Sequence, residues 1–414
     1  MSDRPTVRTD DQGSSVAAED TTDPLLSLTA AEERAVLAEA TRAAGAQLSD
    51  STVRSIHHRP GRSRSVLHDA TIDTPDGTRT VLLVTHTDTR GFPEGAFVLA
   101  QGGRRVAVWR FPHDPYLPGL PSALSAARVR ELLDELGGVP GEVRLRTPVY
   151  RPTRRAVVEA RVDGLDAAGR ILYLKVLPSG RAGSVARRHR QLVAVGLPVP
   201  VLIGVAEQQG IVALEALAGA TLGDALRAGA RVPAVGELVS MSQRFATSGV
   251  AGSRDPRSFA DPVRHVSLLA GVLPERRAEI TALARAASEV TGPIVGVHGD
   301  LHPGQLLIDA EGRLSGVIDV DGAGRGLLAH DAGNLVAHLE ALADLQPMVA
   351  ERVRAYAAEV SAAYREVVGD EPLARAAAGS WIGLATGSYR RQGAGWREET
   401  ARRLDRAAAL LADV

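Results

Sequence analysis

The chain has 414 residues, of which 44% are hydrophobic and 23% are charged, and its formal net charge is −1. This length allows two or three domains, and the near-zero charge gives no general field that would attract nucleic acid or an anionic membrane. The absence of cysteine excludes disulfides and thiolate metal sites. We find no signal-peptide pattern and no apolar run of membrane-spanning length, so a soluble cytoplasmic protein is expected.

The N-terminal third of the chain is predicted to form a separate α+β unit. Residues 1–25 are polar and rich in Asp, Thr and Ser, which is typical of a disordered tail. Thr29, with Glu32 three residues later, predicts the capped start of a helix. Short predicted strands and glycine turns follow, and a helix is predicted over 126–136. We interpret 26–140 as an N-terminal cap domain.

A second run of predicted strands begins near residue 150 and resembles the first. Arg-Pro-Gly-Arg at 59–62 precedes one predicted strand pair, and Arg-Pro-Thr-Arg at 151–154 precedes the other. An internal duplication and a chance likeness of two basic turns both stay open. Only the second copy contains a lysine: where it has Lys175, the first has Thr85 or a neighbour.

Lys175 is the only lysine in the chain and lies on a predicted alternating strand. Lysine is a compact point charge, whereas arginine is a planar fork. A single lysine in a chain that otherwise uses arginine therefore indicates a site where arginine will not serve, although chance retention is the alternative. The predicted helix that follows, about 182–195, contains no acidic residue.

The segment 297–331 carries most of the functional signal. Asp300 precedes a predicted β-hairpin, Gln305 lies at the start of its first strand, and Asp319 lies in the second apolar run. Asp300 could accept a proton from a hydroxyl group. Gln305 and Asp319 could offer oxygen ligands to a hard cation such as Mg²⁺. A polar hairpin without a catalytic role is the alternative.

This pattern of His-Gly-Asp, a later amide residue and an Ile-Asp pair resembles the catalytic segment of the kinase-like small-molecule phosphotransferases, the family of aminoglycoside phosphotransferases. Most members have Asn where this chain has Gln305, but the maltokinase-like and glucosamine-kinase-like branches resemble it in the glutamine and in an N-terminal cap. The resemblance covers roughly 145–400. It implies a protein-kinase-like bilobal α+β fold, with an antiparallel N-lobe sheet over 141–215 and a helical C-lobe over 216–414.

The resemblance also implies a set of site residues. They are a catalytic base, two Mg²⁺ ligands, a phosphate-binding lysine, and two positions whose backbone groups bind adenine: Asp300, Gln305 and Asp319, Lys175, Glu215 and Leu217. The helix glutamate that normally pairs with the lysine is missing, so either another carboxylate such as Glu159 replaces it or phosphate alone orients Lys175. A glycine-rich phosphate loop is also missing, and the turn at 151–155 would take its place.

We therefore expect an enzyme that depends on ATP and Mg²⁺ and moves the γ-phosphate to a hydroxyl of a small molecule: a sugar, an amino sugar or an aminoglycoside. A catalytically weak nucleotide-binding pseudokinase is the alternative, motivated by the missing glutamate and by Gln305. A third possibility is that 26–140 binds a partner protein. Neither a nucleic-acid partner nor a membrane is expected, and the oligomeric state stays open. Asp331 is expected to cap the helix after the hairpin and to support the catalytic loop.

Overall fold

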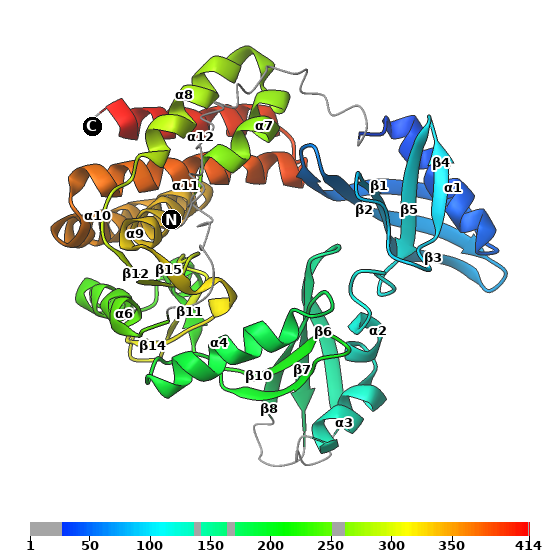
Figure 1. Cartoon of the computed structure of the whole chain (residues 1–414), viewed down its shortest axis with the longest axis horizontal. Coiled ribbons are helices and arrows are strands. Elements are labelled where there is room, and N and C mark those ends of the chain that lie inside the picture. The colour runs from blue at the N-terminus through cyan, green and yellow to red at the C-terminus, as the bar shows by residue number, and fades with distance from the viewer. Residues whose placement is uncertain (1–26, 136–141, 164–169, 251–260, 413) are drawn as a thin grey trace, which may run out of the picture.

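The computed structural model describes residues 27–135, 142–163, 170–250, 261–412 and 414. The predicted disordered tail, 1–25, lies outside the described residues. Figure 1 shows three parts of the chain arranged in a ring: an N-terminal sheet with one helix, a second sheet, and a large helical part. This is the predicted α+β class, with antiparallel sheets beside a helical lobe and an additional N-terminal unit.

The N-terminal unit, which we call the cap, contains one helix and a five-stranded antiparallel sheet of order β1-β2-β3-β5-β4. Its elements are α1 (Ala30–Ala43), β1 (Gln47–Arg59), β2 (Ser63–Thr74), β3 (Gly77–Asp88), β4 (Val98–Gln101) and β5 (Arg104–Arg110). The predicted capping box is present, because the Thr29 hydroxyl accepts from Glu32 N and Thr29 N donates to the Glu32 carboxylate. Helix α1 packs its apolar side against the sheet through Val36 and Leu37.

A connector and a second five-stranded antiparallel sheet, the N-lobe sheet, follow. The elements are α2 (Leu120–Ala123), α3 (Ala126–Glu135), β6 (Val143–Arg151), β7 (Arg155–Val162), β8 (Arg170–Val176), α4 (Ala182–Ala194), β9 (Leu202–Ala206) and β10 (Ile211–Glu215). The sheet order is β6-β7-β8-β10-β9, which is the same order as in the cap. Helix α4 lies between β8 and β9, at a position where the cap has no helix.

The two sheets also agree in detail at their first hairpins. The β1–β2 turn has Gly61 at φ +68°, and the β6–β7 turn has Thr153 at φ +62°. Counting outward from these turns, Ser65 pairs with His86 and Val157 pairs with Lys175. His86 therefore holds the place of Lys175 in the cap, and it is a neighbour of Thr85. The shared strand order and turn conformation are what an internal duplication would produce.

The remainder of the chain is mainly helical. It contains β11 (Ala220–Thr221), α5 (Leu222–Arg227), α6 (Val235–Thr247), α7 (Val263–Val272), η1 (Pro274–Arg276), α8 (Arg277–Ser288), β12 (Ile294–Val297), β13 (Leu306–Ile308), β14 (Leu314–Val317), η2 (Val320–Gly322), β15 (Gly324–Leu327), α9 (Leu328–Leu345), η3 (Pro347–Val349), α10 (Ala350–Val368), α11 (Asp370–Arg391) and α12 (Trp396–Ala412). The predicted hairpin is present as β13 and β14, which pair antiparallel. Within the described ranges, none of the helices has both the length and the apolar character needed to cross a membrane.

Polar and aromatic contacts attach the cap to the N-lobe. The buried Asp114 carboxylate accepts hydrogen bonds from Thr153 N at 2.8 Å and from the Tyr150 hydroxyl at 2.9 Å, and Trp109 Nε1 donates to that hydroxyl at 2.9 Å. The segment that leaves the cap thus holds the β6–β7 turn in place. On the other side of the ring, β1 packs against α11.

Candidate active site

The loop after β12 is fixed by a buried carboxylate on α9. Asp331 accepts from His298 N at 2.6 Å and from Gly299 N at 2.8 Å. Gly299 has φ +87°, and a Cβ there would lie 2.8 Å from Gly322 O, so a larger residue would not fit without a shift. The expected support of the loop by Asp331 is present. The expected helix cap is wrong, because α9 begins at Leu328 and Asp331 lies inside its first turn.

His298 connects this loop to the end of strand β14. Its Nε2 donates to Ile318 O at 3.0 Å, and its Nδ1 accepts from Asp300 N at 3.3 Å. A neutral imidazole protonated at Nε2 satisfies both bonds. Because Ile318 directly precedes Asp319, the histidine fixes the two acidic positions relative to each other.

Asp300 sits in a polar but poorly solvated position. Asn334 donates to its Oδ1 at 3.3 Å and to Leu301 O at 3.0 Å. Burial and the negative charges of Asp319 and Asp331 raise the pKa of Asp300 to about 7. The carboxylate form therefore becomes dominant as the pH rises through about 7, and a general base works best when its pKa is close to the working pH.

Asn334 is a residue to which the sequence analysis assigned no role. It follows Asp331 by three positions, so both side chains project from one side of α9. One residue supports the loop backbone while the other holds the Asp300 side chain. The i, i+3 spacing after a loop-supporting aspartate was the available signal, but it becomes informative only when the helix is known to start before Asp331.

Gln305 presents an acceptor that the described part of the chain does not satisfy. Its side chain is 4% exposed, and its Oε1 has no hydrogen-bond partner there. Its backbone carbonyl accepts from Ile318 N at 2.9 Å, which places it beside Asp319. An unpaired buried amide oxygen costs about 1–3 kcal/mol, and a bound cation would remove that cost.

The donor set at this place suits Mg²⁺. The groups are an amide oxygen of Gln305 and a carboxylate of Asp319, both hard oxygen ligands. No group of three or more His, Cys, Asp or Glu side chains with metal-binding geometry occurs among the described residues. An ion here would therefore take two protein ligands and complete its shell with phosphate oxygens and water, as Mg²⁺ commonly does.

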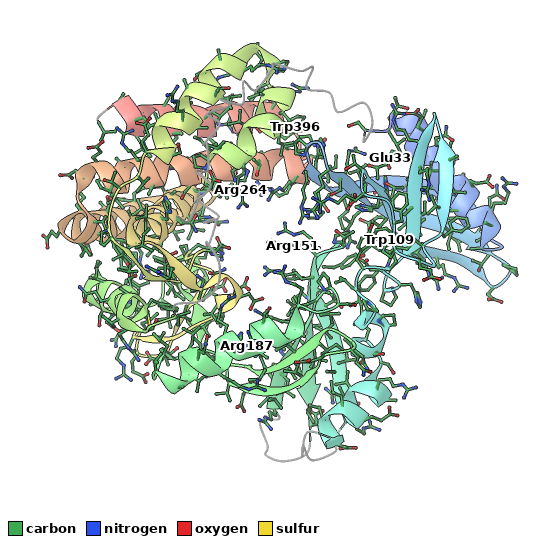
Figure 2. All side chains as sticks on the ribbon, viewed as in Figure 1. Glu33, Trp109, Arg151, Arg187, Arg264 and Trp396 are labelled. Atoms are coloured by element: carbon green, nitrogen blue, oxygen red, sulfur yellow. The ribbon has the colours of Figure 1, made fainter. Side chains whose placement is uncertain are left out.

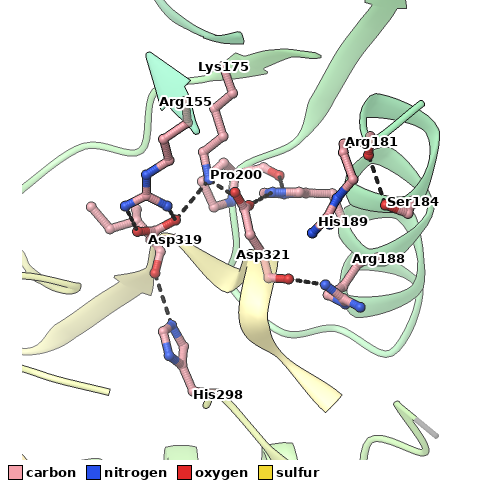
Figure 3. Close-up of polar contacts among 11 residues, drawn as sticks. Arg155, Lys175, Arg181, Ser184, Arg188, His189, Pro200, His298, Asp319 and Asp321 are labelled. Atoms are coloured by element: carbon pink, nitrogen blue, oxygen red, sulfur yellow. Dashed lines mark hydrogen bonds and ion pairs between the residues drawn. The ribbon is translucent and has the colours of Figure 1, made fainter. Parts of the chain in front are cut away.

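Asp319 is the centre of an ion network, shown in Figure 3. Arg155 binds it through two parallel contacts of 3.1 and 2.9 Å, and Lys175 Nζ lies 3.2 Å from its Oδ1. Lys175 also donates to Asp321 Oδ1 at 2.6 Å. Lys175 is 7% exposed, and although burial opposes its charge, Asp321 and Asp319 raise its pKa above the usual value.

The partner of Lys175 is therefore a carboxylate that the sequence analysis missed. Glu159, the substitute considered there, instead binds Arg146 at 2.5 Å and Arg161 at 2.9 Å. Asp321 comes two positions after Asp319. The available signal was therefore a second acidic residue close to an expected metal ligand. Its nearness to Lys175 depends on how the two lobes pack.

Helix α4 meets this network with basic residues. Arg188 donates to the backbone carbonyl of Asp321, and His189 Nε2 lies 3.7 Å from Asp321 Oδ1. The Nδ1 of His189 bonds to Pro200 O at 2.9 Å. Burial opposes the charge of Asp321, but Lys175 and His189 outweigh it and hold its pKa well below the usual range. The helix therefore holds Asp321 and not the lysine.

The two expected adenine-binding positions lie at the C-terminal end of β10, an inner strand of the N-lobe sheet. Glu215 ends β10, its N–H donates to Val201 O at 2.9 Å, and its carboxylate pairs with Arg170 at 3.1 Å. Leu217 lies two residues further on, and no backbone partner is found for its N–H in the described part of the chain. A Cβ on Gly316 would lie 2.6 Å from Leu217 Cδ1, so this segment packs on strand β14.

The structure thus brings Asp300, Gln305, Asp319 and Lys175 into one site, through the loop contacts of His298 and the ion network. Glu215 and Leu217 make no contact with these four side chains in the described part of the chain. Glu215 ends the strand next to the one that carries Lys175, and Leu217 lies just beyond it. The expected phosphate-binding turn, 151–155, contributes Arg155 to the site directly.

Part of the chain is similar to a known protein family. The model of the phosphotransferase enzyme family matches residues 165–368. No curated protein matches the chain. Solved structures that resemble it include an aminoglycoside phosphotransferase in complex with ADP and hygromycin B, at 14% identity and a TM-score of 0.42, covering 69% of this chain and 98% of that one.

Two further similar structures come from named organisms. A choline kinase from Cryptosporidium parvum Iowa II has 11% identity and a TM-score of 0.45, covering 70% of this chain and 96% of that one. An aminoglycoside phosphotransferase from Streptomyces rimosus has 18% identity and a TM-score of 0.39, covering 61% and 97%. All these TM-scores are below 0.5, so the family assignment depends on the family model. The match to the phosphotransferase enzyme family is limited to residues 165–368, slightly under half of the chain, and over that segment the chain resembles this family.

Proposed function

We propose that the protein transfers the γ-phosphate of ATP to a hydroxyl group of a small molecule in a Mg²⁺-dependent reaction. The observation that carries this proposal is the buried, unpaired Oε1 of Gln305 beside Asp319, in a site that also holds a base with a raised pKa. A hairpin with a purely structural role would have no reason to bury an unsatisfied oxygen there. The matching family contains phosphotransferases.

The roles proposed for the side chains follow from their positions. Asp300 orients the acceptor hydroxyl and takes its proton, because it is a half-buried carboxylate on the catalytic loop whose pKa is raised to about 7. Gln305 and Asp319 hold Mg²⁺, which when bound neutralises phosphate charge. Lys175, held by Asp321, presents a positive charge to the nucleotide phosphates.

Two backbone groups are proposed to bind the base of the nucleotide. The N–H of Leu217 has no backbone partner in the described residues, so it can donate to a ring nitrogen of adenine. The carbonyl of Glu215 lies two positions earlier in the chain and would accept from the exocyclic amine. The side chains at both positions point to other contacts and would not select the base. We also propose that the protein is cytoplasmic, where ATP is available.

The ion network must rearrange for this chemistry. Arg155 covers both oxygens of Asp319, so the carboxylate can bind Mg²⁺ only after that guanidinium has moved. An arginine released in this way stays next to the site and can pair with phosphate oxygens by a bidentate contact. The positive charges that neutralise Asp319 in the structure are thus ready to meet the nucleotide.

Calorimetric titration with ATP, with and without Mg²⁺, tests the proposal on the wild type and on Asp319→Ala. We expect Mg²⁺-dependent binding to the wild type and its loss in the variant. Glu311→Ala is the matched control, because it removes an exposed acid from the turn of the same hairpin, and it should bind like the wild type. ATP binding that is unaffected by both Mg²⁺ and Asp319→Ala would remove Asp319 from the metal site.

The pseudokinase alternative has lost its main motivation. It was based on a lysine without an acidic partner and on the change to Gln305. Lys175 has two carboxylate partners, Asp321 and Asp319, and the Gln305 amide oxygen is available as a ligand. No described contact favours this alternative.

A further inference from the structure

Five arginines from three parts of the chain face the same region beside the catalytic loop. They are at the end of β1, on the β6–β7 turn, at the start of α7 and at the end of α11: Arg59, Arg151, Arg154, Arg264 and Arg390. Helix α11 packs against both β1 and α7, which brings these three elements together. Figure 2 shows Arg151 and Arg264 on the inner side of the ring. We call these residues the arginine cluster.

The members of the arginine cluster repel one another. Partial burial and then the charges of Arg59, Arg151 and Arg390 lower the pKa of Arg154 to about 9. Partial burial and then Arg151, Arg264 and Arg59 lower the pKa of Arg390 to about 10. These interactions show that charges from the cap, the N-lobe and the helical lobe lie close enough to affect each other. Like charges held together destabilise a fold unless counter-charges are near.

The described part of the chain does not supply those counter-charges in full. No hydrogen bond or ion pair to the guanidinium groups of Arg59, Arg151, Arg154 or Arg390 is found among the residues that the structure describes. His57, which lies among them on β1, is neutral at pH 7, because burial and the surrounding arginines lower its pKa to about 4. Each guanidinium keeps five N–H donors in a fork that matches a carboxylate or phosphate.

The arginine cluster is next to the proposed base, because Arg151 and Arg264 both interact with the charge of Asp300. Burial lowers the pKa of Arg264, and the charges of Asp261 and Asp300 act against that effect. Burial and the neighbouring acids raise the pKa of Asp300, and the charge of Arg151 acts against them. Lys175 and Arg155 instead contact Asp319. Asp300 thus has cations on two sides: those of the metal site, and those of the cluster, which come largely from the cap and the helical lobe.

We propose that the arginine cluster binds an anionic group of the acceptor, so that the substrate is a hydroxylated small molecule carrying a carboxylate or a phosphate. This inference rests on the proposed function. An anion on the cluster would place a neighbouring hydroxyl beside Asp300. A cationic acceptor such as an amino sugar would instead be repelled by several unpaired guanidinium groups. The cap would then complete the acceptor site, since it supplies Arg59 and holds the turn that carries Arg151 and Arg154.

The first experiment measures anion binding without turnover. Thermal unfolding is followed in millimolar sodium sulfate against sodium chloride of equal ionic strength, with ADP and Mg²⁺ saturating so that the nucleotide site is filled. We expect sulfate to raise the Tm of the wild type and not to raise that of Arg59→Gln or Arg390→Gln. Arg391→Gln is the matched control: it removes the same charge one residue further along α11, from an exposed side chain that acts on Arg403, and it should respond like the wild type.

The second experiment compares acceptors that share one ring and differ in charge. ADP formation is measured with glucosamine, glucose, glucuronate and glucose 6-phosphate. We expect kcat/KM to be at least about tenfold higher for an anionic acceptor than for glucosamine. This ratio measures how much more strongly the enzyme binds the transition state of the anionic acceptor. Arg390→Gln should raise KM for the anionic acceptor with little change in kcat or in the Kd of ATP. A preference for glucuronate or for the sugar phosphate tells which anion fits.

Several outcomes would overturn the inference. These are an equal sulfate response in the wild type and both cluster variants, a higher kcat/KM for glucosamine than for the anions, or a Kd of ATP that rises as much as the acceptor KM. The last result would assign the cluster to the nucleotide site. If ATP and ADP fail to bind at all, the proposed function fails, while the sulfate comparison among the variants still decides whether the cluster is an anion site.

Discussion

The cap sheet and the N-lobe sheet have the same strand order but carry different side chains at equivalent positions. Both have five antiparallel strands in the same order, and both open with a hairpin whose turn contains Arg-Pro-x-Arg. In the N-lobe, the third strand carries Lys175, which is paired with acids from the helical lobe. In the cap, the same place is held by His86, which packs edge-on against Trp109 and Tyr116 at 5.8 and 5.3 Å.

The two sheets also differ in the charged contacts that their helices make. In the cap, Glu33 of α1 binds Arg64 at 2.6 Å and His68 at 3.0 Å, so the helix supplies the acid and the sheet supplies the bases. In the N-lobe, α4 supplies Arg188 and His189, and the acid comes from outside the sheet. The cap thus pairs the acid of its helix with bases of its own sheet, whereas Lys175 of the N-lobe depends on the helical lobe for a counter-charge. We conclude that a shared strand order does not determine which copy can bind a nucleotide.

The largest effect is expected from Asp300→Asn, for which the cap has no counterpart. The amide keeps the size of the side chain but cannot take a proton, so kcat should fall by about 10²–10⁴. Binding of ATP should be retained, because Lys175 and the metal site are unchanged. Single-turnover kinetics combined with calorimetry gives both quantities. Turnover close to that of the wild type would remove Asp300 from its proposed role.

The next largest effect separates the two sheets directly. Lys175→Arg should lower kcat/KM by on the order of 100-fold, because a planar fork cannot replace the point charge between Asp319 and Asp321. His86→Gln, at the equivalent place in the cap, should lower the Tm and leave kcat/KM of the folded protein within about twofold, since His86 has no contact with the site. Equal kinetic losses in both variants would show that the cap also takes part in nucleotide binding.

A smaller effect tests the connection between the cap and the N-lobe. Asp114→Ala leaves the N–H groups of Thr153 and Tyr116 without their acceptor, so the free energy of unfolding should fall by about 1–3 kcal/mol. The turn that carries Arg151 should also lose its fixed position, which would raise the KM of the acceptor more than that of ATP. Asp76→Ala, in an exposed turn of the cap, serves as the control. A change in stability with both KM values unaltered would limit Asp114 to a structural role.

The smallest effect is expected at the two equivalent turns. Thr153 holds a left-handed conformation that costs an L-residue about 1–2 kcal/mol, whereas glycine adopts it without that cost. Thr153→Gly should therefore raise the free energy of unfolding by up to about 1 kcal/mol, and Gly61→Thr should lower it by a similar amount. Chemical denaturation measures both. Changes of the same sign in both variants would mean that the two turns are not equivalent.

Much of this protein is determined by the sequence itself. The spacing of Asp300, Gln305 and Asp319 around a hairpin is a local pattern, because a loop, a strand and a turn of a few residues fix their order. The uniqueness of Lys175 was visible without any coordinates. The capping box at Thr29 and Glu32 formed as predicted, since it depends on four neighbouring residues only.

Which charged side chains meet depends on the packing of distant segments. Asp321 was hidden as the partner of Lys175, because 146 residues separate the two and their contact depends on the packing of the helical lobe against the N-lobe sheet. The same holds for the arginine cluster, whose members lie on elements distant in sequence. Asp331 changed from an expected helix cap to a residue within the first turn because α9 starts earlier than the hydrophobic pattern indicates. Contacts between distant segments depend on the relative orientation of whole elements, and no local periodicity carries that information.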